Sequence, residues 1–295
     1  MKKSNRSTYV VSIITFIIAI IMGFVTTAIV MEKKNKVSYQ MGSSSNIAEV
    51  EQIKNTSTQI ENTSKQENKD TRDKTTNEIT SDTKQTTEKK VIVIDPGHQT
   101  KGNSEKEPIG PGATETKAKV TGGATGVATG KTEYQLNLEV ALKLKSALED
   151  KGYSVIMTRE ENNVNLSNSE RAQIANNANA AAFIRIHANS SDNSSVKGVL
   201  TMCQTSNNKY NGNIASESYK LSKAVLDNFV SETGATNKGV TRTDTMSGIN
   251  WCTVPTTIVE MGFMSNPEED RLMVTESYQN KMLNGIVKGI EQFLE

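Results

Sequence analysis

Hydrophobic and polar positions divide this chain into unlike parts. Residues 10–31 contain no charged side chain, and a helix of that length rises about 33 Å, enough to cross a hydrocarbon core of about 30 Å. Residues 32–89 are almost entirely polar, so they cannot bury enough apolar area to offset the entropy of ordering them. The pattern predicts a short polar tail at 1–9, a transmembrane helix at 10–31, a disordered polar linker at 32–89 and a folded domain at 90–295.

A cleaved signal peptide is the alternative interpretation of the first hydrophobic run. The run is longer than the apolar core of about 7–15 residues that is usual in such peptides. It also lacks a clean A-x-A cleavage site, and residues 26–28 are a weak candidate. We therefore expect an uncleaved anchor. Lysines flank the run on both sides, so charge does not give its orientation, which has to follow from function.

Within residues 90–295, strand-like and helix-like patterns alternate, which is typical of one α/β domain. We expect a single three-layer domain with a mostly parallel or mixed central sheet flanked by helices. The expected strands are VIVID at 91–95, YSVIMTR at 153–159, AAFIRIHAN at 181–189, GVLTMCQ at 198–204 and TTIVEMGF at 256–263.

Helical spacing predicts four helices, three between these strands and one after the last strand. Ser167 and Glu170 form a capping box that opens the helix at 169–180. The first helix of the domain runs from about Thr132 to Asp150 and stops at Gly152. Its apolar face carries Tyr134, Leu138, Ala141, Leu142 and Leu148. The third helix carries Ile214, Leu221, Val225 and Phe229 and ends at Gly234, and the fourth carries Leu283, Ile286, Val287, Ile290 and Phe293.

Charge and cysteine content exclude several classes of protein. The 34 Lys and Arg residues nearly balance the 33 Asp and Glu residues, for a net charge of +1, so a nucleic-acid partner is not expected. Cys203 and Cys252 are too few for a disulfide scaffold or a four-cysteine zinc site, although one bridge between them stays open. We interpret both as small apolar residues. The stretch TGVATGKT is similar to a phosphate-binding loop, but Thr125 stands where glycine is required, so no nucleotide is expected.

Both histidines of the chain follow or end predicted strands. His98 comes after VIVIDPG, His187 ends AAFIRIH, and Glu260 lies in TTIVE. In open α/β sheets the ligand crevice lies beyond the carboxyl ends of the strands, so these three groups should converge. Glu133 begins the first helix and can face the same edge.

Two imidazoles, one carboxylate and a water molecule make an open catalytic zinc site, and a second carboxylate would be the general base. That is the chemistry of amide hydrolysis. Taken alone, each residue also allows a structural role. A histidine at a strand end is often structural, Glu260 could form a buried salt bridge, and an acidic residue such as Glu133 in a first helical turn suits the helix dipole.

Four stretches carry a resemblance to a known family: VIVIDPGH, TEYQLNLEVALKLKSALEDKGYSVIMTR, ERAQIANNANAAAFIRIHAN and VPTTIVEMGFMSNPEED. From Val91 to about Phe293 the chain resembles the zinc-dependent N-acetylmuramoyl-L-alanine amidases that cleave bacterial peptidoglycan. The resemblance implies that His98, Glu133 and His187 bind zinc (Zn2+). It also implies that Glu260 is the catalytic acid/base.

Some positions differ from the family pattern or fall outside it. Arg185 stands where many members have serine, and we expect this difference to affect substrate preference without touching the four reacting positions. Residues 99–132 read as one long loop beside the site, which is expected either to form a groove wall or lid or to be a solvated insertion. Trp251 either lines the groove or only packs.

These observations predict a membrane-anchored, single-pass enzyme whose catalytic domain lies outside the cytoplasm, where its peptidoglycan substrate is. The alternative location is secretion after signal cleavage. No regulatory protein partner can be identified from the sequence. Two other functions remain: a wall-binding or scaffolding protein that keeps the fold without turnover, and a zinc peptidase acting within the stem peptide. The first would lack one of the four reacting residues, and this chain has all four.

Overall fold

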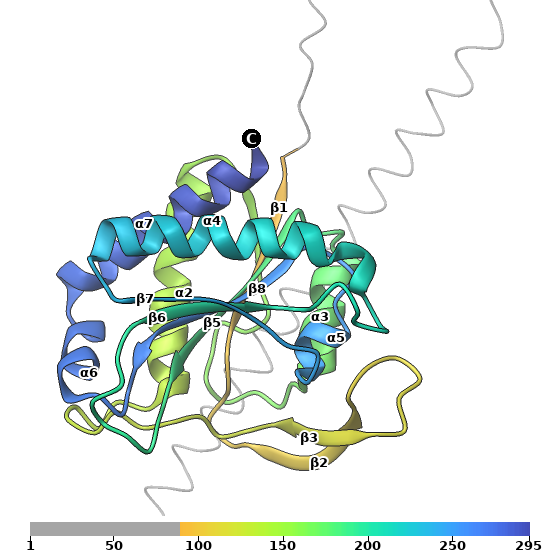
Figure 1. Cartoon of the computed structure of the whole chain (residues 1–295), viewed down its shortest axis with the longest axis horizontal. Coiled ribbons are helices and arrows are strands. Elements are labelled where there is room, and N and C mark those ends of the chain that lie inside the picture. Colours follow the sequence, from red (N-terminus) through yellow and green to blue (C-terminus); the bar gives the residue numbers. More distant parts are fainter. Residues whose placement is uncertain (1–88) are drawn as a thin grey trace, which may run out of the picture. The chain divides into compact units, whose positions relative to one another are not determined.

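The computed structural model describes residues 89–295, which form a mixed α/β domain (Figure 1). The tail, membrane helix and linker predicted for residues 1–88 lie outside this range and stay predictions. Within the described range, no helix combines the length and the apolar character needed to span a bilayer.

The central sheet of the described domain has six strands in the order β4-β1-β5-β8-β6-β7. The first four of these run parallel, β6 pairs antiparallel with β8, and β7 is parallel to β6. The expected mostly parallel or mixed sheet is therefore confirmed. The strands are β1 (Val91–Pro96), β4 (Ser154–Met157), β5 (Ala182–Asn189), β6 (Val199–Cys203), β7 (Asn237–Arg242) and β8 (Thr256–Phe263).

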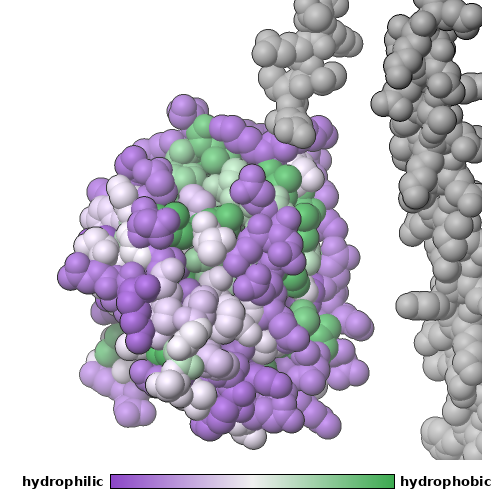
Figure 2. All heavy atoms as spheres, turned by 90° about the vertical axis from the view of Figure 1, so that its right-hand side faces the viewer, coloured by the Kyte–Doolittle hydropathy of each residue, from purple (hydrophilic) through white to green (hydrophobic). Residues whose placement is uncertain are grey.

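Helices cover both faces of this sheet. Figure 1 shows α4 and α7 on one side of the strands, and α3 and α5 on the other. Hydrophilic residues cover most of the face shown in Figure 2, where hydrophobic residues form small separate areas. The helices are α2 (Glu133–Asp150), α3 (Asn168–Asn177), α4 (Ala215–Thr233), α5 (Ser247–Asn250), α6 (Pro267–Met273) and α7 (Glu276–Leu294), with a short 3-10 turn at Gly212–Ile214.

The predicted helix ends agree with the structure. Ser167 Oγ accepts a hydrogen bond from the backbone N–H of Glu170, and Ser167 N–H donates to Glu170 Oε2 at 2.7 Å, so the capping box that opens α3 is confirmed. Gly234 follows α4 with φ +71°, and Gly152 follows α2 with φ +91°. Both angles lie in the left-handed region that glycine adopts without steric cost.

The predicted buried face of α2 is wrong in part. Leu142 is 40% exposed, whereas Leu136, Val140 and Leu144, which the prediction omitted, are fully buried. The helix packs against β1, β4 and β5 and also against α7. Its buried stripe is consequently wider than a single line of apolar residues and is rotated away from Leu142.

Residues 99–132 are not one long loop. They contain a hairpin in which β2 (Asn103–Pro108) pairs antiparallel with β3 (Thr116–Val120). The strand sequences NSEKEP and TKAKV are mostly polar because the hairpin lies outside the main sheet. The apolar alternation that identifies half-buried strands is therefore missing from them.

Side-chain hydrogen bonds hold this hairpin against the domain. Glu107 Oε2 accepts a hydrogen bond from Ser169 Oγ at 2.6 Å, at the start of α3. Trp251 Nε1 donates to the carbonyl oxygen of Pro108 at 2.8 Å. The tryptophan, for which groove lining and packing were both open, thus packs where β2 runs into the connecting loop of the hairpin.

Candidate active site

The proposed reacting groups come together at the carboxyl edge of the parallel strands. His98 follows β1, His187 lies near the end of β5, and Glu260 is its paired residue on β8. His98 has φ +61°, a left-handed conformation that is uncommon for residues other than glycine. Glu133, the first residue of α2, completes the group. The structure therefore brings together all four residues that the sequence singled out.

Three potential metal-ligand atoms of this group, one from each of His98, Glu133 and His187, lie close to one another. His98 Nε2 is 3.0 Å from Glu133 Oε1, His187 Nδ1 is 3.2 Å from the same oxygen, and the two ring nitrogens are 3.2 Å apart. His98, Glu133 and His187 form the only group of three or more potential metal ligands found among residues 89–295.

Hydrogen bonds fix the orientation of two of these side chains. His98 Nδ1 lies 2.9 Å from the carbonyl oxygen of Thr121, which can only accept, so Nδ1 donates and, in the neutral ring, Nε2 keeps its lone pair. Burial lowers the pKa of His98, but the hydrogen bond and charge of Glu133 outweigh it and raise that pKa, so a metal ion has to displace the proton. Glu133 accepts from the backbone N–H groups of Ala124 at 2.9 Å and Ala188 at 3.2 Å. The carboxylate is thereby held in place before any ion binds.

The turn before His98 is packed tightly against the other histidine. A Cβ atom added at Gly97 would lie 2.1 Å from Cε1 of the His187 ring. The carbonyl oxygen of Gly97 accepts hydrogen bonds from Asn137 Nδ2 at 3.2 Å and from Arg159 Nη2 at 3.1 Å. The glycine of DPGH is thus required by the close approach of the imidazole.

Burial and neighbouring charges shift the pKa values of the group apart. Burial alone would raise the pKa of Glu133, but hydrogen bonds with His187 and His98 outweigh it and hold that pKa well below its usual range. Burial lowers the pKa of His187 to about 4, so the ring is neutral at pH 7 and available as a ligand. Burial and the charge of Glu133 raise the pKa of Glu260 to about 8. A carboxyl group poised near neutrality suits proton transfer.

A pocket of about 380 Å³ lies beside the metal-ligand group. Its walls come from the sheet, the hairpin strand β3, the start of α3 and the segment that leads into α5. Glu260 is the one acidic residue among its lining side chains, and Trp251 is not among them. The lining residues are His98, Lys117, Ala118, Val120, Thr121, Asn168, Arg185, His187, Met202, Met246, Ser247, Gly248, Ile258 and Glu260.

A buried charge cluster supports the pocket and was missed by the sequence analysis. Asp95 is fully buried and accepts from Arg171 Nη1 at 2.7 Å and from Arg185 Nε at 2.9 Å. Arg185 also lines the pocket with His187 and Glu260. Arg185 therefore shares the pocket with the reacting groups, and its expected effect on substrate preference stays a prediction. The signal was an arginine inside the buried run AAFIRIH, because such a charge needs a buried partner.

The segment that is similar to a phosphate-binding loop serves the fold. The backbone N–H groups of Ala128 and Thr129 donate to Asp270 Oδ2 at 2.7 and 2.8 Å, and Thr129 Oγ1 donates to Oδ1. Asp270, on α6, is 1% exposed. These amides therefore bind a carboxylate of the chain itself. The two cysteines are both buried and unpaired, so no bridge joins them.

Known proteins share both the sequence pattern and the fold. The chain is 29% identical over 218 residues to the germination-specific N-acetylmuramoyl-L-alanine amidase of Bacillus subtilis, covering 69% of this chain and 79% of that protein. The catalytic domain of CwlV, an N-acetylmuramoyl-L-alanine amidase from Bacillus (Paenibacillus) polymyxa var. colistinus, superposes with a TM-score of 0.56 at 30% identity, covering 70% of this chain and 98% of that one.

The amidase Ami1 from Mycobacterium abscessus, in its apo form, superposes with a TM-score of 0.64 at 25% identity, covering 70% of this chain and 99% of that one. A family model described as N-acetylmuramoyl-L-alanine amidase matches residues 92–292, which include the whole candidate site. On that match, the chain belongs to the N-acetylmuramoyl-L-alanine amidase family.

Proposed function

We propose that this protein is a zinc-dependent hydrolase that cleaves the amide between N-acetylmuramic acid and the L-alanine of the stem peptide in peptidoglycan. His98, Glu133 and His187 hold the zinc ion, and Glu260 is the catalytic acid/base. The observation that carries the proposal is the contact of three ligand atoms beside a buried carboxyl group, at the wall of a pocket. Membership of the amidase family supplies the reaction.

The residues present fit a zinc ion. Two ligands bound tetrahedrally at about 2.0–2.1 Å from zinc lie roughly 3.3 Å apart, and the three donor atoms are separated by 3.0 to 3.2 Å. Two neutral imidazoles and one carboxylate leave a fourth position for water, as in catalytic zinc sites. Burial keeps His187 neutral and the two histidines keep Glu133 ionised, which are the protonation states that ligands require.

When bound, zinc lowers the pKa of a coordinated water and stabilises the negative charge that develops on the attacked carbonyl oxygen. Glu260 Oε2 is buried without a hydrogen-bond partner among the described residues. The charge of a bound zinc ion would favour the ionised form of this carboxyl group, which would then accept the proton of the attacking water. Glu260 then donates that proton to the departing amine of L-alanine. Hydrogen bonds and close packing hold His98, Glu133 and His187 in position throughout.

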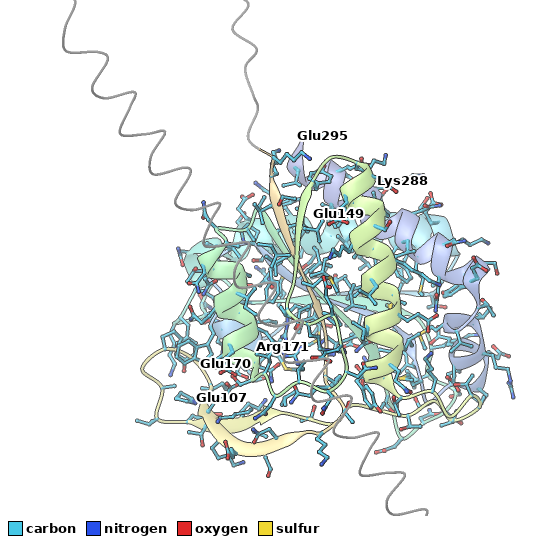
Figure 3. All side chains as sticks on the ribbon, turned by 180° about the vertical axis from the view of Figure 1, so that it is seen from behind. Glu107, Glu149, Glu170, Arg171, Lys288 and Glu295 are labelled. Carbon is cyan, nitrogen blue, oxygen red and sulfur yellow. The ribbon has the colours of Figure 1, made fainter. Side chains whose placement is uncertain are left out.

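The location of the enzyme is part of the proposal. We place the domain outside the cytoplasm, anchored by a transmembrane helix at 10–31 and separated from the bilayer by the polar segment 32–89, because the substrate is extracytoplasmic. The polar segment would join the described domain at the start of β1, beside the last turn of α7, where Lys90 Nζ donates to the carbonyl oxygen of Leu294. Figure 3 shows Glu149 and Glu295 at this end and Arg171, Glu107 and Glu170 at the opposite, hairpin end.

Product analysis tests the reaction. The detergent-solubilised full chain, loaded with zinc, is incubated with purified peptidoglycan, and the released material is examined by mass spectrometry. We expect intact stem peptides that begin with a free L-alanine amine, and no release after chelation. Fragments cut within the stem would identify a zinc peptidase instead. Binding without any release would identify a wall-binding protein.

Fractionation tests the location. The full chain should remain with membranes after washing with high salt, and protease added to intact cells without their wall should digest the catalytic domain. Recovery of a shortened, soluble protein from the medium would favour cleavage of a signal peptide. A domain that is protected from protease would contradict the proposed orientation.

A further inference from the structure

Arg185 is a buried cation whose hydrogen bonds are incomplete. Its side chain is buried, with a relative exposure of 4%. Nε donates to Asp95 Oδ2 and Nη2 donates to Asn168 Oδ1, each at 2.9 Å. Among residues 89–295, no hydrogen-bond partner is found for Nη1. Because Arg185 lines the pocket, this nitrogen has donors available for a ligand there.

The strands set Arg185 close to the reacting groups. Arg185 and His187 are two residues apart on β5, so both project from the same face at a spacing of roughly 6.6 Å. Their paired residues on β8 are Ile258 and Glu260. Arg185 therefore lies one pleat further along the pocket floor than the proposed metal ligand His187, on the strand next to the one that carries Glu260.

The neighbouring helix α5 keeps the guanidinium group in this place. A Cβ atom added at Gly248 would lie 2.2 Å from Nη1 and 2.6 Å from Cζ of Arg185. The backbone of α5 is thus in close contact with one side of the group, while Asp95 and Asn168 hold two of its nitrogens. A preorganised guanidinium group binds a carboxylate with little further loss of entropy.

Charge in this part of the pocket is unbalanced. One carboxylate, Asp95, is shared by two guanidinium groups, those of Arg171 and Arg185. Lys117 also lines the pocket from β3, where its Nζ donates to the carbonyl oxygen of Thr245. The acidic lining residue, Glu260, has the proton-transfer role already described. A pocket with this excess of positive charge favours a substrate that brings an anionic group.

The substrate offers such a group on one side of the scissile bond. The sugar and its lactyl ether are neutral near this bond, whereas the peptide carries carboxyl groups. The second stem residue is a glutamate joined through its side chain, so its α-carboxyl group is either a free anion or an amide. Consecutive Cα atoms are about 3.8 Å apart, so this carboxyl group is within reach of a site roughly 6.6 Å along the floor from the metal ligand.

We propose that Arg185 binds the free α-carboxylate of the second stem residue and thereby selects unamidated stem peptides. This inference rests on the proposed amidase function and adds a specificity residue to it. The free Nη1 group can donate to an oxygen of the carboxylate, and this charge-assisted hydrogen bond is stronger than one to the oxygen of a neutral carboxamide.

The test compares two synthetic muramoyl tripeptides that differ at one group, the free α-carboxylate or the carboxamide of the second residue. For the zinc-loaded full chain we expect kcat/KM to be at least about tenfold higher for the carboxylate, mainly through a lower KM. Arg185→Ser should reduce this ratio to near one, and Arg185→Lys should retain part of it. Lys119→Ser is the matched control, because it removes a cation of the neighbouring strand β3 that does not line the pocket, and it should keep the ratio.

The outcomes separate this inference from the amidase function. Equal turnover of both substrates by the unmodified protein would overturn the role of Arg185 and leave the amidase activity in place. This comparison needs no variant, so it decides the question even if Arg185→Ser fails to fold. Loss of the ratio in Lys119→Ser as well would assign the effect to the general positive charge around the pocket and overturn direct binding by Arg185. No turnover of either substrate with zinc bound would contradict the proposed function itself.

Discussion

His187 and Glu260 are paired residues of the adjacent parallel strands β5 and β8. In a parallel ladder, paired residues project from the same face of the sheet. A proposed metal ligand and the proposed acid/base are thus fixed side by side by backbone hydrogen bonds, without depending on a loop. Small errors of placement are costly in catalysis, and two central strands of a sheet are among the most rigid mounts available.

Glu260→Gln should abolish turnover and leave zinc binding intact. Glutamine has nearly the same shape but cannot accept and return the proton of the attacking water, a role that contributes typically about 10²–10⁴-fold to rate. Turnover of peptidoglycan and the zinc content of the purified variant are the two measurements. Undiminished activity with full zinc occupancy would contradict the proposed role of Glu260. Glu105→Gln, at an exposed position on β2, is the control and should change neither value.

Gly97→Ala should weaken zinc binding although it removes no ligand. The added methyl carbon would lie 2.1 Å from the ring of His187, so the imidazole has to move away from Glu133. Loss of support around a ligand typically lowers metal affinity by about 10–100-fold. Competition with a chromogenic chelator measures the change.

Gly122→Ala is the matched control for this prediction. An added Cβ at Gly122 has no atom within 4 Å, and the residue lies in the segment beside Thr121 and thus near the same site. We expect its zinc affinity to equal that of the unmodified protein. Equal affinities for all three proteins would show that the contact between Gly97 and His187 does not position the ligand.

The sequence predicted the site because each reacting residue is attached to a strongly patterned element. VIVID and TTIVEMGF are apolar runs that can only be buried strands, so the residues at their ends were assigned to one edge of the sheet. The role of Glu133 could not be derived in this way, since an acidic first turn is common in helices. Its place followed from the family resemblance, and the geometry then brought it within 3.2 Å of both histidines.

Elements held by polar contacts were predicted poorly. β2 and β3 carry no apolar alternation, and β7, NKGVTR, is an exposed strand at the edge of the sheet, so periodicity gave no signal for any of them. The pocket wall formed by β3 therefore became visible only in three dimensions. Arg185 was underestimated for a related reason, because its partner Asp95 is 90 residues away in sequence.

Zinc should stabilise the protein against thermal unfolding. An ion that binds the folded state alone adds stability that grows with its concentration, about 2.7 kcal/mol at one hundred times the dissociation constant. We expect Tm to rise when zinc is added to the chelated protein and to stay unchanged in His98→Ala, measured by calorimetry. An equal rise of Tm in His98→Ala would place the stabilising ion elsewhere.

Asp95 should make the fold sensitive to acid. Burial opposes ionisation, but Arg171 and Arg185 outweigh it and hold the pKa of Asp95 far below its usual range. A carboxyl group whose pKa is lowered by folding contributes its full stability above its unfolded pKa of about 3.9 and loses it as the pH falls below that value. Urea unfolding of the zinc-free protein should therefore show the midpoint falling progressively as the pH drops below about 4.

At pH 7, Asp95→Asn should lower the free energy of unfolding by roughly 3–5 kcal/mol, because it leaves two buried cations without their carboxylate. Asp192→Asn, at an exposed position, should change it by less than about 0.5 kcal/mol. A variant at position 95 as stable as the unmodified protein at pH 7 would show that the buried cluster does not hold the pocket floor in place.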